Sequence, residues 1–261
     1  MSQEIDPSRP SIARAYDVVL GGKDNYAADR AFADQLRATV PQIDDLAWLN
    51  RRLLGRAVRY LAGEAGLDQF LDLGAGLPTM ENTHQVAQAQ NPDTRVVYVD
   101  IDPIVLAHGQ ALLAENGRTG VITADLRDPT AVLEHPTTRE LIDRGRPVAV
   151  LLIGLLHHLH DDENPQGIVD AYMDAVPAGS HLAISHFCDV GPEARELQET
   201  FLTFLGTGRF RTIEEITGYF RGLELIEPGV VPLPVWRPDG LPPGELTLWD
   251  RLMAAGVARK R

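Results

Sequence analysis

The chain has 261 residues, 44% of them hydrophobic, which is enough to bury the core of one large domain. Acidic residues outnumber basic ones 37 to 24, and the net charge of −13 argues against binding to the polyphosphate backbone of nucleic acid. No apolar run approaches the roughly 18 residues that a membrane-spanning helix needs, and the single cysteine, Cys188, excludes an internal disulfide. We therefore expect a cytoplasmic protein that binds neither nucleic acid nor membranes.

Short apolar segments alternate with segments of helical periodicity along most of the chain. The β-branched, apolar runs predict five strands, at Gln69–Leu73, Arg95–Asp100, Gly120–Thr123, Val148–Ile153 and His181–Phe187. The helical spacing of apolar residues predicts helices at Leu46–Ala62, Thr83–Gln90, Pro103–Glu115, Ile168–Val176, Pro192–Leu205 and Ile213–Phe220. A terminal pair of strands, which can be antiparallel, is expected within Leu223–Pro228 and Thr247–Arg259.

The alternation of strands and helices predicts the fold class. Val148–Ile153 is apolar on both faces, as a strand of a parallel sheet covered by helices on each side must be. We expect an α/β, Rossmann-like fold with a seven-stranded, mostly parallel sheet, helices on both faces and an N-terminal helical extension. In this interpretation residues 1–45 form the extension and residues 46–261 form a single globular domain.

A glycine-rich turn follows the first predicted strand. In the segment Phe70–Thr79, Gly74 and Gly76 let the chain turn sharply and let a ligand approach the backbone closely. The third glycine of a dinucleotide-binding turn would fall at Thr79, so that fingerprint is broken here. An NAD-dependent oxidoreductase is therefore a weaker alternative for this architecture.

Three aspartates stand at or just beyond the ends of three successive strands. Asp72 closes the first strand, Asp100 ends the second, and Asp125 follows the third. These carboxylates match, in order, a cationic amino-acid group, the two hydroxyls of a ribose and the exocyclic amine of an adenine. Each of them alone is more often a helix cap or a turn former, but the three together, beside the glycine turn, favour a nucleoside-linked amino acid as ligand.

This combination resembles the class I S-adenosylmethionine-dependent methyltransferases, and several further strings narrow the resemblance. The segment Pro10–Arg30 is similar to the opening of an actinobacterial S-adenosyl methyltransferase family first catalogued as a domain of unknown function. The other family-like strings are Gly76–Thr79, Asn82–Gln88, Leu155–Leu159 and Gly256–Lys260, so the resemblance spans nearly the whole chain. It implies a methyltransferase that uses S-adenosyl-L-methionine and releases S-adenosyl-L-homocysteine.

The resemblance also implies a set of site residues. Those expected at the cofactor are Asp72, Gly74, Ala75, Gly76, Pro78, Thr79, Asp100, Ile101, Asp125, Leu126, Ile153, Gly154 and His157. Those expected in a lid over the cofactor and substrate are Tyr16, Lys23, Asp24, Asn25 and Tyr26. The structural alternative for the same segment is a helical hairpin packed on the sheet, with Asp24 or Asn25 capping its second helix.

Catalytic residues are harder to identify, because methyl transfer from a sulfonium needs alignment and only sometimes a base. His157 and His158 follow the fourth strand and are the candidate bases, with His186 as a second candidate; packing roles are the alternative for all three. The neighbouring histidines and carboxylates lack the spacing of a metal site, so we expect no metal.

The sequence leaves the acceptor open. We expect a small molecule, methylated by a monomer or a homodimer, and a non-catalytic protein that binds S-adenosylmethionine as a regulator is the alternative. Apolar residues within Pro228–Pro243 could line an acceptor pocket or a dimer contact.

Overall fold

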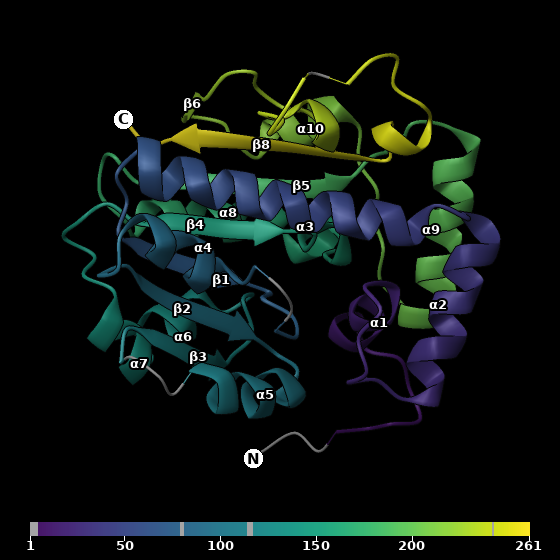
Figure 1. The fold of residues 1–261 in the computed structure, drawn as a ribbon, viewed down its shortest axis with the longest axis horizontal. Coiled ribbons are helices and arrows are strands. Elements are labelled where there is room, and N and C mark those ends of the chain that lie inside the picture. The colour runs from purple at the N-terminus through teal and green to yellow at the C-terminus, as the bar shows by residue number, and fades with distance from the viewer. Residues whose placement is uncertain (1–4, 79–80, 114–116, 242) are drawn as a thin grey trace.

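A computed structural model describes residues 5–78, 81–113, 117–241 and 243–261, and a single sheet lies at its centre (Figure 1). Eight strands occur in the described part of the chain, in the order β3-β2-β1-β4-β5-β8-β6, with β7 paired to β8. Their bounds are β1 Gln69–Leu73, β2 Arg95–Asp100, β3 Thr119–Thr123, β4 Ala149–Ile153, β5 His181–Phe187, β6 Glu224–Leu225, β7 Val231–Pro232 and β8 Met253–Arg259. The first five strands are parallel, and β8 runs antiparallel to β5.

Helices cover both faces of this sheet. Their bounds are α1 Ile12–Val19, α2 Ala27–Thr39, α3 Ile43–Arg59, α4 Thr83–Gln90, α5 Pro103–Leu113, α6 Pro129–Leu133, α7 Pro136–Leu141, α8 Pro165–Asp174, α9 Pro192–Leu205 and α10 Ile213–Gly218. Along β1, Phe70 packs into one apolar core with α3, whereas Leu71 and Leu73 pack into the other with α8. The predicted α/β architecture with two helical layers is therefore confirmed.

The differences from the predicted elements are small and have local causes. The sheet has eight strands rather than seven because the two-residue strand β7 adds to β8. The helices α6 and α7, each begun by a proline, are too short for an apolar period to predict them. The end of the predicted helix Pro103–Glu115 lies outside the described residues beyond Leu113.

The N-terminal helices α1 and α2 lie beyond the carboxyl ends of the parallel strands, next to α9 (Figure 1). A buried ion pair joins them, with Arg14 Nε 2.9 Å from Asp29 Oδ2. The residue at the N-cap of α2 is Tyr26, whose backbone N–H donates to Asp29 Oδ2 over 2.8 Å, rather than the predicted Asp24 or Asn25. Since α3 begins at Ile43, the predicted boundary between residues 45 and 46 falls within a helix.

The C-terminal segment that includes Pro228–Pro243 packs on α3. Leu233 and Trp236 are fully buried, and the guanidinium of Arg56 donates to their carbonyl oxygens over 2.7 and 3.0 Å. Leu233 and Trp236 therefore belong to the core, and none of the described residues of this segment lines the cavity at the strand ends, so an acceptor-pocket role is not supported there. Among the described helices, none is long and apolar enough to cross a membrane.

Candidate functional site

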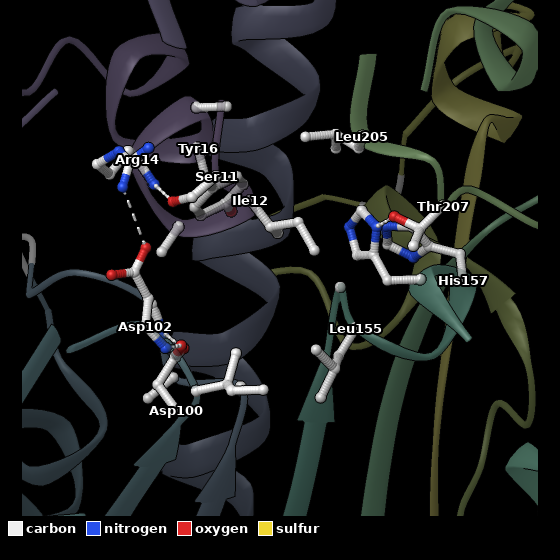
Figure 2. Close-up of a pocket in the computed structure, with 18 of the residues that line it drawn as sticks. Ser11, Ile12, Arg14, Tyr16, Asp100, Asp102, Leu155, His157, Leu205 and Thr207 are labelled. Atoms are coloured by element: carbon white, nitrogen blue, oxygen red, sulfur yellow. Dashed lines mark hydrogen bonds and ion pairs between the residues drawn. The ribbon is translucent and has the colours of Figure 1, made fainter. Parts of the chain in front are cut away.

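A cavity of about 660 Å³ opens at the carboxyl ends of the parallel strands (Figure 2). The strand order reverses between β2, β1 and β4, and this switch point is where open α/β sheets bind ligands. The turn after β1 and the loops after β2, β3 and β4 form the floor, while α1, α2, α3 and α9 supply the walls. In Figure 2, Asp100 and Asp102 lie on one side of this space and His157 and Thr207 on the other.

The turn after β1 has the backbone that its glycines predict. Gly74 and Gly76 have φ angles of 70° and 67°, in the left-handed region that favours glycine. The N–H groups of Gly74 and Ala75 both donate to the carbonyl of Val99, over 2.8 and 3.1 Å. A side chain at Gly74 would lie 2.5 Å from Leu155, so the turn sits directly beside the loop after β4.

The carboxylate of Asp100 is held by two backbone donors. Gly76 N–H donates to Oδ2 and Asp102 N–H donates to Oδ1, each over 2.9 Å. Asp100 lines the cavity, and a carboxylate offers about four acceptor positions, so these backbone donors leave it able to accept from a ligand. Burial raises the pKa of this carboxyl, because these two hydrogen bonds compensate only part of the lost hydration.

Asp72 is buried at the floor of the same cavity. Its Oδ2 accepts a hydrogen bond of 2.6 Å from the hydroxyl of Thr83, at the start of α4. Burial raises the pKa of Asp72 to about 6, and the Thr83 hydrogen bond opposes that rise. A cation entering beside Asp72 would meet a carboxylate that gains from a positive partner.

Asp125 stands at the mouth of the cavity with Arg127. The Arg127 guanidinium lies 2.6 Å from Asp125 Oδ2 and also pairs with Glu163 over 2.7 Å. Burial opposes ionisation of Asp125, but the hydrogen bonds and charge of Arg127 outweigh it and lower its pKa. The carboxylate of Asp125, which we expected to accept from an adenine amine, therefore already accepts hydrogen bonds from Arg127.

A chain of hydrogen bonds connects α1, α3 and the strand ends. Asn50 Nδ2 donates to the hydroxyl of Tyr16, which itself donates to Ala47, and Asn50 Oδ1 accepts from Ser185 Oγ over 2.6 Å. Ser185 in turn accepts from the N–H of Gly154. Burial raises the pKa of the Tyr16 phenol, so it is neutral and positions α1 over the cavity.

His157 and His158 lie together at the far side of the cavity. Their ring centroids are 4.3 Å apart, and His158 Nδ1 lies 3.0 Å from the hydroxyl of Thr207. Burial lowers the pKa of His158 to about 3 and that of His157 well below its ordinary value, so both imidazoles are neutral near pH 7. They can accept a proton only as weak bases.

The structure brings most of the predicted site residues to this cavity. Those that line it are Tyr16, Asp72, Gly74, Ala75, Gly76, Asp100, Ile101, Asp125, Leu126, Ile153, Gly154, His157 and His158. The predicted residues that do not line it are Lys23, Asp24, Asn25, Tyr26, Pro78 and His186, while Thr79 lies outside the described residues. Of the residues expected in a lid, Tyr16 on α1 lines the cavity and the four in the loop after α1 do not, and the role of that loop as a lid stays a prediction.

Three of the predicted residues that do not line the cavity have clear structural partners. Asn25 donates to Asp17 on α1, and Asp24 lies 3.5 Å from His108 on α5. His186 is fully buried behind the cavity, where its Nε2 lies 3.1 Å from the guanidinium of Arg211.

Asn50 and Arg14 are among the polar residues of the site that sequence reasoning missed. Asn50 occupies the apolar stripe of α3 between Leu46 and Leu53, and a lone amide on an apolar face was the available signal. Arg14 had no such signal, since only the folded chain brings its guanidinium between Asp29 and Asp102, the latter 3.6 Å away (Figure 2).

Comparison with known families shows to which family the chain belongs. A family described as S-adenosyl methyltransferase matches residues 1–261. The chain belongs to this S-adenosyl methyltransferase family. The predicted enzyme class, a methyltransferase that depends on S-adenosylmethionine, is thereby confirmed, and so is the predicted cofactor.

Solved structures agree with this membership. A protein from Thermobifida fusca described as a candidate methyltransferase is 51% identical, with a TM-score of 0.95 over 98% of this chain and 97% of that one. A protein of the domain-of-unknown-function family 574 from Streptomyces avermitilis is 39% identical, with a TM-score of 0.95 over 99% of this chain and 100% of that one. Human N-acetylserotonin methyltransferase, solved with S-adenosylmethionine, shares the fold at 14% identity, with a TM-score of 0.51 over 97% of this chain and 63% of that one. A search of curated proteins found no match to the chain.

The residues at one end of the cavity fit this cofactor. S-adenosylmethionine supplies a methyl group on a positively charged sulfonium and carries an ammonium, a ribose and an adenine. The three carboxylates line the cavity and supply acceptors for such donors. We call this part of the cavity, lined by Asp72, Gly74, Gly76, Asp100 and Asp125, the cofactor end.

Proposed function

We propose that this protein transfers the methyl group of S-adenosylmethionine to a small-molecule acceptor inside the cavity. The observation that carries the proposal is the continuity of that cavity. It extends from Asp100 at the cofactor end, past Gly154 and Leu155, to His157 and the walls formed by α1, α2 and α9. One space can therefore hold a cofactor and an acceptor side by side, which is the main requirement of methyl transfer.

In this proposal the residues at the cofactor end bind and orient the cofactor, and none of them activates the acceptor chemically. Asp100 accepts from the ribose hydroxyls, Asp72 faces the ammonium, and the turn at Gly74 and Gly76 lets the ligand lie against the backbone. The helix α1 covers the cavity and limits the entry of water, and the hydrogen bond from Asn50 to Tyr16 fixes it there.

Binding of S-adenosylhomocysteine, measured by titration calorimetry, tests the cofactor part. Asp100→Asn turns one acceptor into a donor that faces a backbone N–H. We expect it to weaken binding by about tenfold to a hundredfold, the cost of losing hydrogen bonds to a charged group. Asp93→Asn is the matched control, because the side chain of Asp93 is 79% exposed and pairs with Arg118 at the surface.

If Asp100→Asn and the wild type bind S-adenosylhomocysteine with equal affinity, Asp100 does not bind the ribose hydroxyls. The transfer itself is tested with S-adenosylmethionine carrying a deuterated methyl group and a panel of small molecules, followed by mass spectrometry. Label in a product with the wild type, and loss of it with Asp100→Asn, is the expected result. A protein that binds the cofactor but labels nothing across a broad panel would contradict the proposal.

A further inference from the structure

The end of the cavity opposite the cofactor end is aromatic. We call it the aromatic end, and it consists of Phe32, His157, His158, Phe187, Phe201, Leu205 and Thr207. The ring of His157 lies 4.8 Å from that of Phe187, and Phe201 lies 5.6 Å from Phe32. These residues come from α2, the loop after β4, β5, α9 and the loop after α9, so the surface exists only in the folded chain.

Charge is confined to the rest of the cavity. The charged side chains that line it, among the described residues, are Asp6, Arg9, Arg14, Arg51, Asp72, Asp100, Asp102, Asp125 and Arg127. They come from residues 6–14, from α3, from the cofactor end or from the loops after β2 and β3, and none belongs to the aromatic end. Because burial keeps His157 and His158 neutral, this end offers no counter-ion. A charged group placed there would lose its hydration without gaining a partner.

The aromatic end nevertheless carries polar atoms that lack partners. His157 Nδ1 is enclosed by protein and has no hydrogen-bond partner among the described residues, so a ligand would reach the other nitrogen of that ring, Nε2, to which no hydrogen bond occurs in the same residues. His158 uses Nδ1 towards Thr207, and no hydrogen bond to its Nε2 occurs in the described part of the chain. An unpaired polar atom in an apolar surrounding is unfavourable, so a ligand that supplies one hydroxyl would be favoured there.

We propose that the aromatic end binds an uncharged, ring-bearing acceptor whose methylated group is a hydroxyl hydrogen-bonded to the His157–His158 pair. The inference rests on the proposed methyl transfer and names its substrate class. Its basis is the set of facing rings, the absence of charge and the unpartnered imidazole nitrogens. Leu155, Leu205 and Phe187 provide the apolar contacts around the acceptor ring.

The chemistry of the step is compatible with such weak bases. A lone pair of the hydroxyl oxygen forms the new O–C bond, and the C–S bond breaks with its electrons left on sulfur. The hydroxyl proton, which becomes strongly acidic as the new bond forms, passes to an imidazole nitrogen of the pair. A histidine of low pKa suffices for this transfer, because the proton leaves an oxygen that is becoming positively charged.

Three probes that share one ring system test the substrate class. Naphthol is neutral near pH 7, naphthoate is an anion and naphthylmethylammonium is a cation. With the protein saturated by S-adenosylhomocysteine, we expect naphthol to bind at least about tenfold more tightly than either charged probe, since a buried unpaired charge is costly. Equal or tighter binding of a charged probe would overturn the proposal.

A charge introduced into the aromatic end tests the location. Leu205→Asp places a carboxylate there and should make naphthylmethylammonium the preferred probe. Thr203→Asp, at an exposed position of the same helix, is the matched control and should leave the order unchanged. If Leu205→Asp binds the three probes in the same order of affinity as the wild type, the probes bind elsewhere and the proposal fails. If this variant does not fold, the order of probe affinities in the wild type still tests the substrate class.

The hydroxyl contact is tested by comparing naphthol with naphthalene. The wild type should prefer naphthol by about fivefold, the size of one neutral hydrogen bond, and His157→Phe or His158→Phe should abolish that preference. A preference that survives in both variants would remove the histidines from the proposal. Affinity for S-adenosylhomocysteine is measured first in every protein. A wild type that does not bind it refutes the proposed function. Normal binding of S-adenosylhomocysteine with another order of probe affinities refutes only the proposed acceptor class.

Discussion

The buried carboxyl of Asp72 should make cofactor binding depend on pH. Its pKa is raised to about 6 by burial, and only its ionised form attracts the ammonium group of the cofactor. The ionised fraction is about 0.1 near pH 5 and about 0.9 near pH 7, so the affinity should rise roughly tenfold over this interval. Asp72→Asn should remove this rise while keeping an oxygen that accepts from Thr83.

Titration calorimetry with S-adenosylhomocysteine, which keeps the ammonium, measures the effect near pH 5, 6 and 7. The wild type should release protons on binding near pH 6, seen as a dependence of the heat on the buffer's ionisation enthalpy, and the variant should release fewer. Asp93→Asn, at an exposed site, is the control. A rise in affinity as steep in Asp72→Asn as in the wild type would refute this role of Asp72.

The same pKa has a consequence for stability without cofactor. The folded protein holds the Asp72 proton up to a higher pH than the unfolded chain, so the stability present below about pH 4 is lost as the pH rises through about 6. A rise from 3.8 to about 6 corresponds to a cost of roughly 3 kcal/mol above pH 6. Asp72→Asn should therefore be more stable than the wild type near pH 7.5, and the difference should shrink towards pH 5; urea unfolding measures both.

Two further predictions concern the walls of the cavity. Because the pKa of His158 is lowered, its contribution to stability is complete above about pH 6.5 and is lost as the pH falls towards 3. Between about pH 7.5 and pH 5, the free energy of unfolding of His158→Asn, measured in urea, should therefore fall by roughly 2 kcal/mol less than that of the wild type. An equal fall in both proteins would contradict the neutral state of His158. Arg14→Ala leaves Asp29 buried without its cation, so it should lower the free energy of unfolding by roughly 3 kcal/mol and make α1 more susceptible to proteolysis. Arg37→Ala, at an exposed ion pair, is the control and should lower it by under about 1 kcal/mol. Equal losses in the two variants would show that the Arg14 pair is not buried in solution.

Local pattern in the sequence was sufficient for the strands and the glycine turn. The bounds of β1, β2 and β5 agree with the predicted ones, because buried strands are short apolar runs with clear ends. The three aspartates could be placed together for a related reason. Parallel strands end at the same edge of a sheet, so a residue at the end of each strand reaches the same cavity.

Tertiary contacts decided which residues of the N-terminal segment face the cavity, and they decided the protonation state of the histidines. Nothing local distinguishes Tyr16, which reaches the cavity, from Tyr26, which caps a helix beside it. The neutral state of His157 depends on burial among rings such as Phe187, from another element.

What the sequence determined by itself is therefore the cofactor end, because its groups sit at fixed offsets from strands whose pattern is local. The aromatic end of the cavity was decided only by the tertiary structure. Its surface combines α2, α9 and the loop after β4, segments far apart in the chain, and its lack of charge follows from which side chains that packing brings together. Burial and pairing are properties of the assembled neighbourhood, and a linear pattern does not contain them.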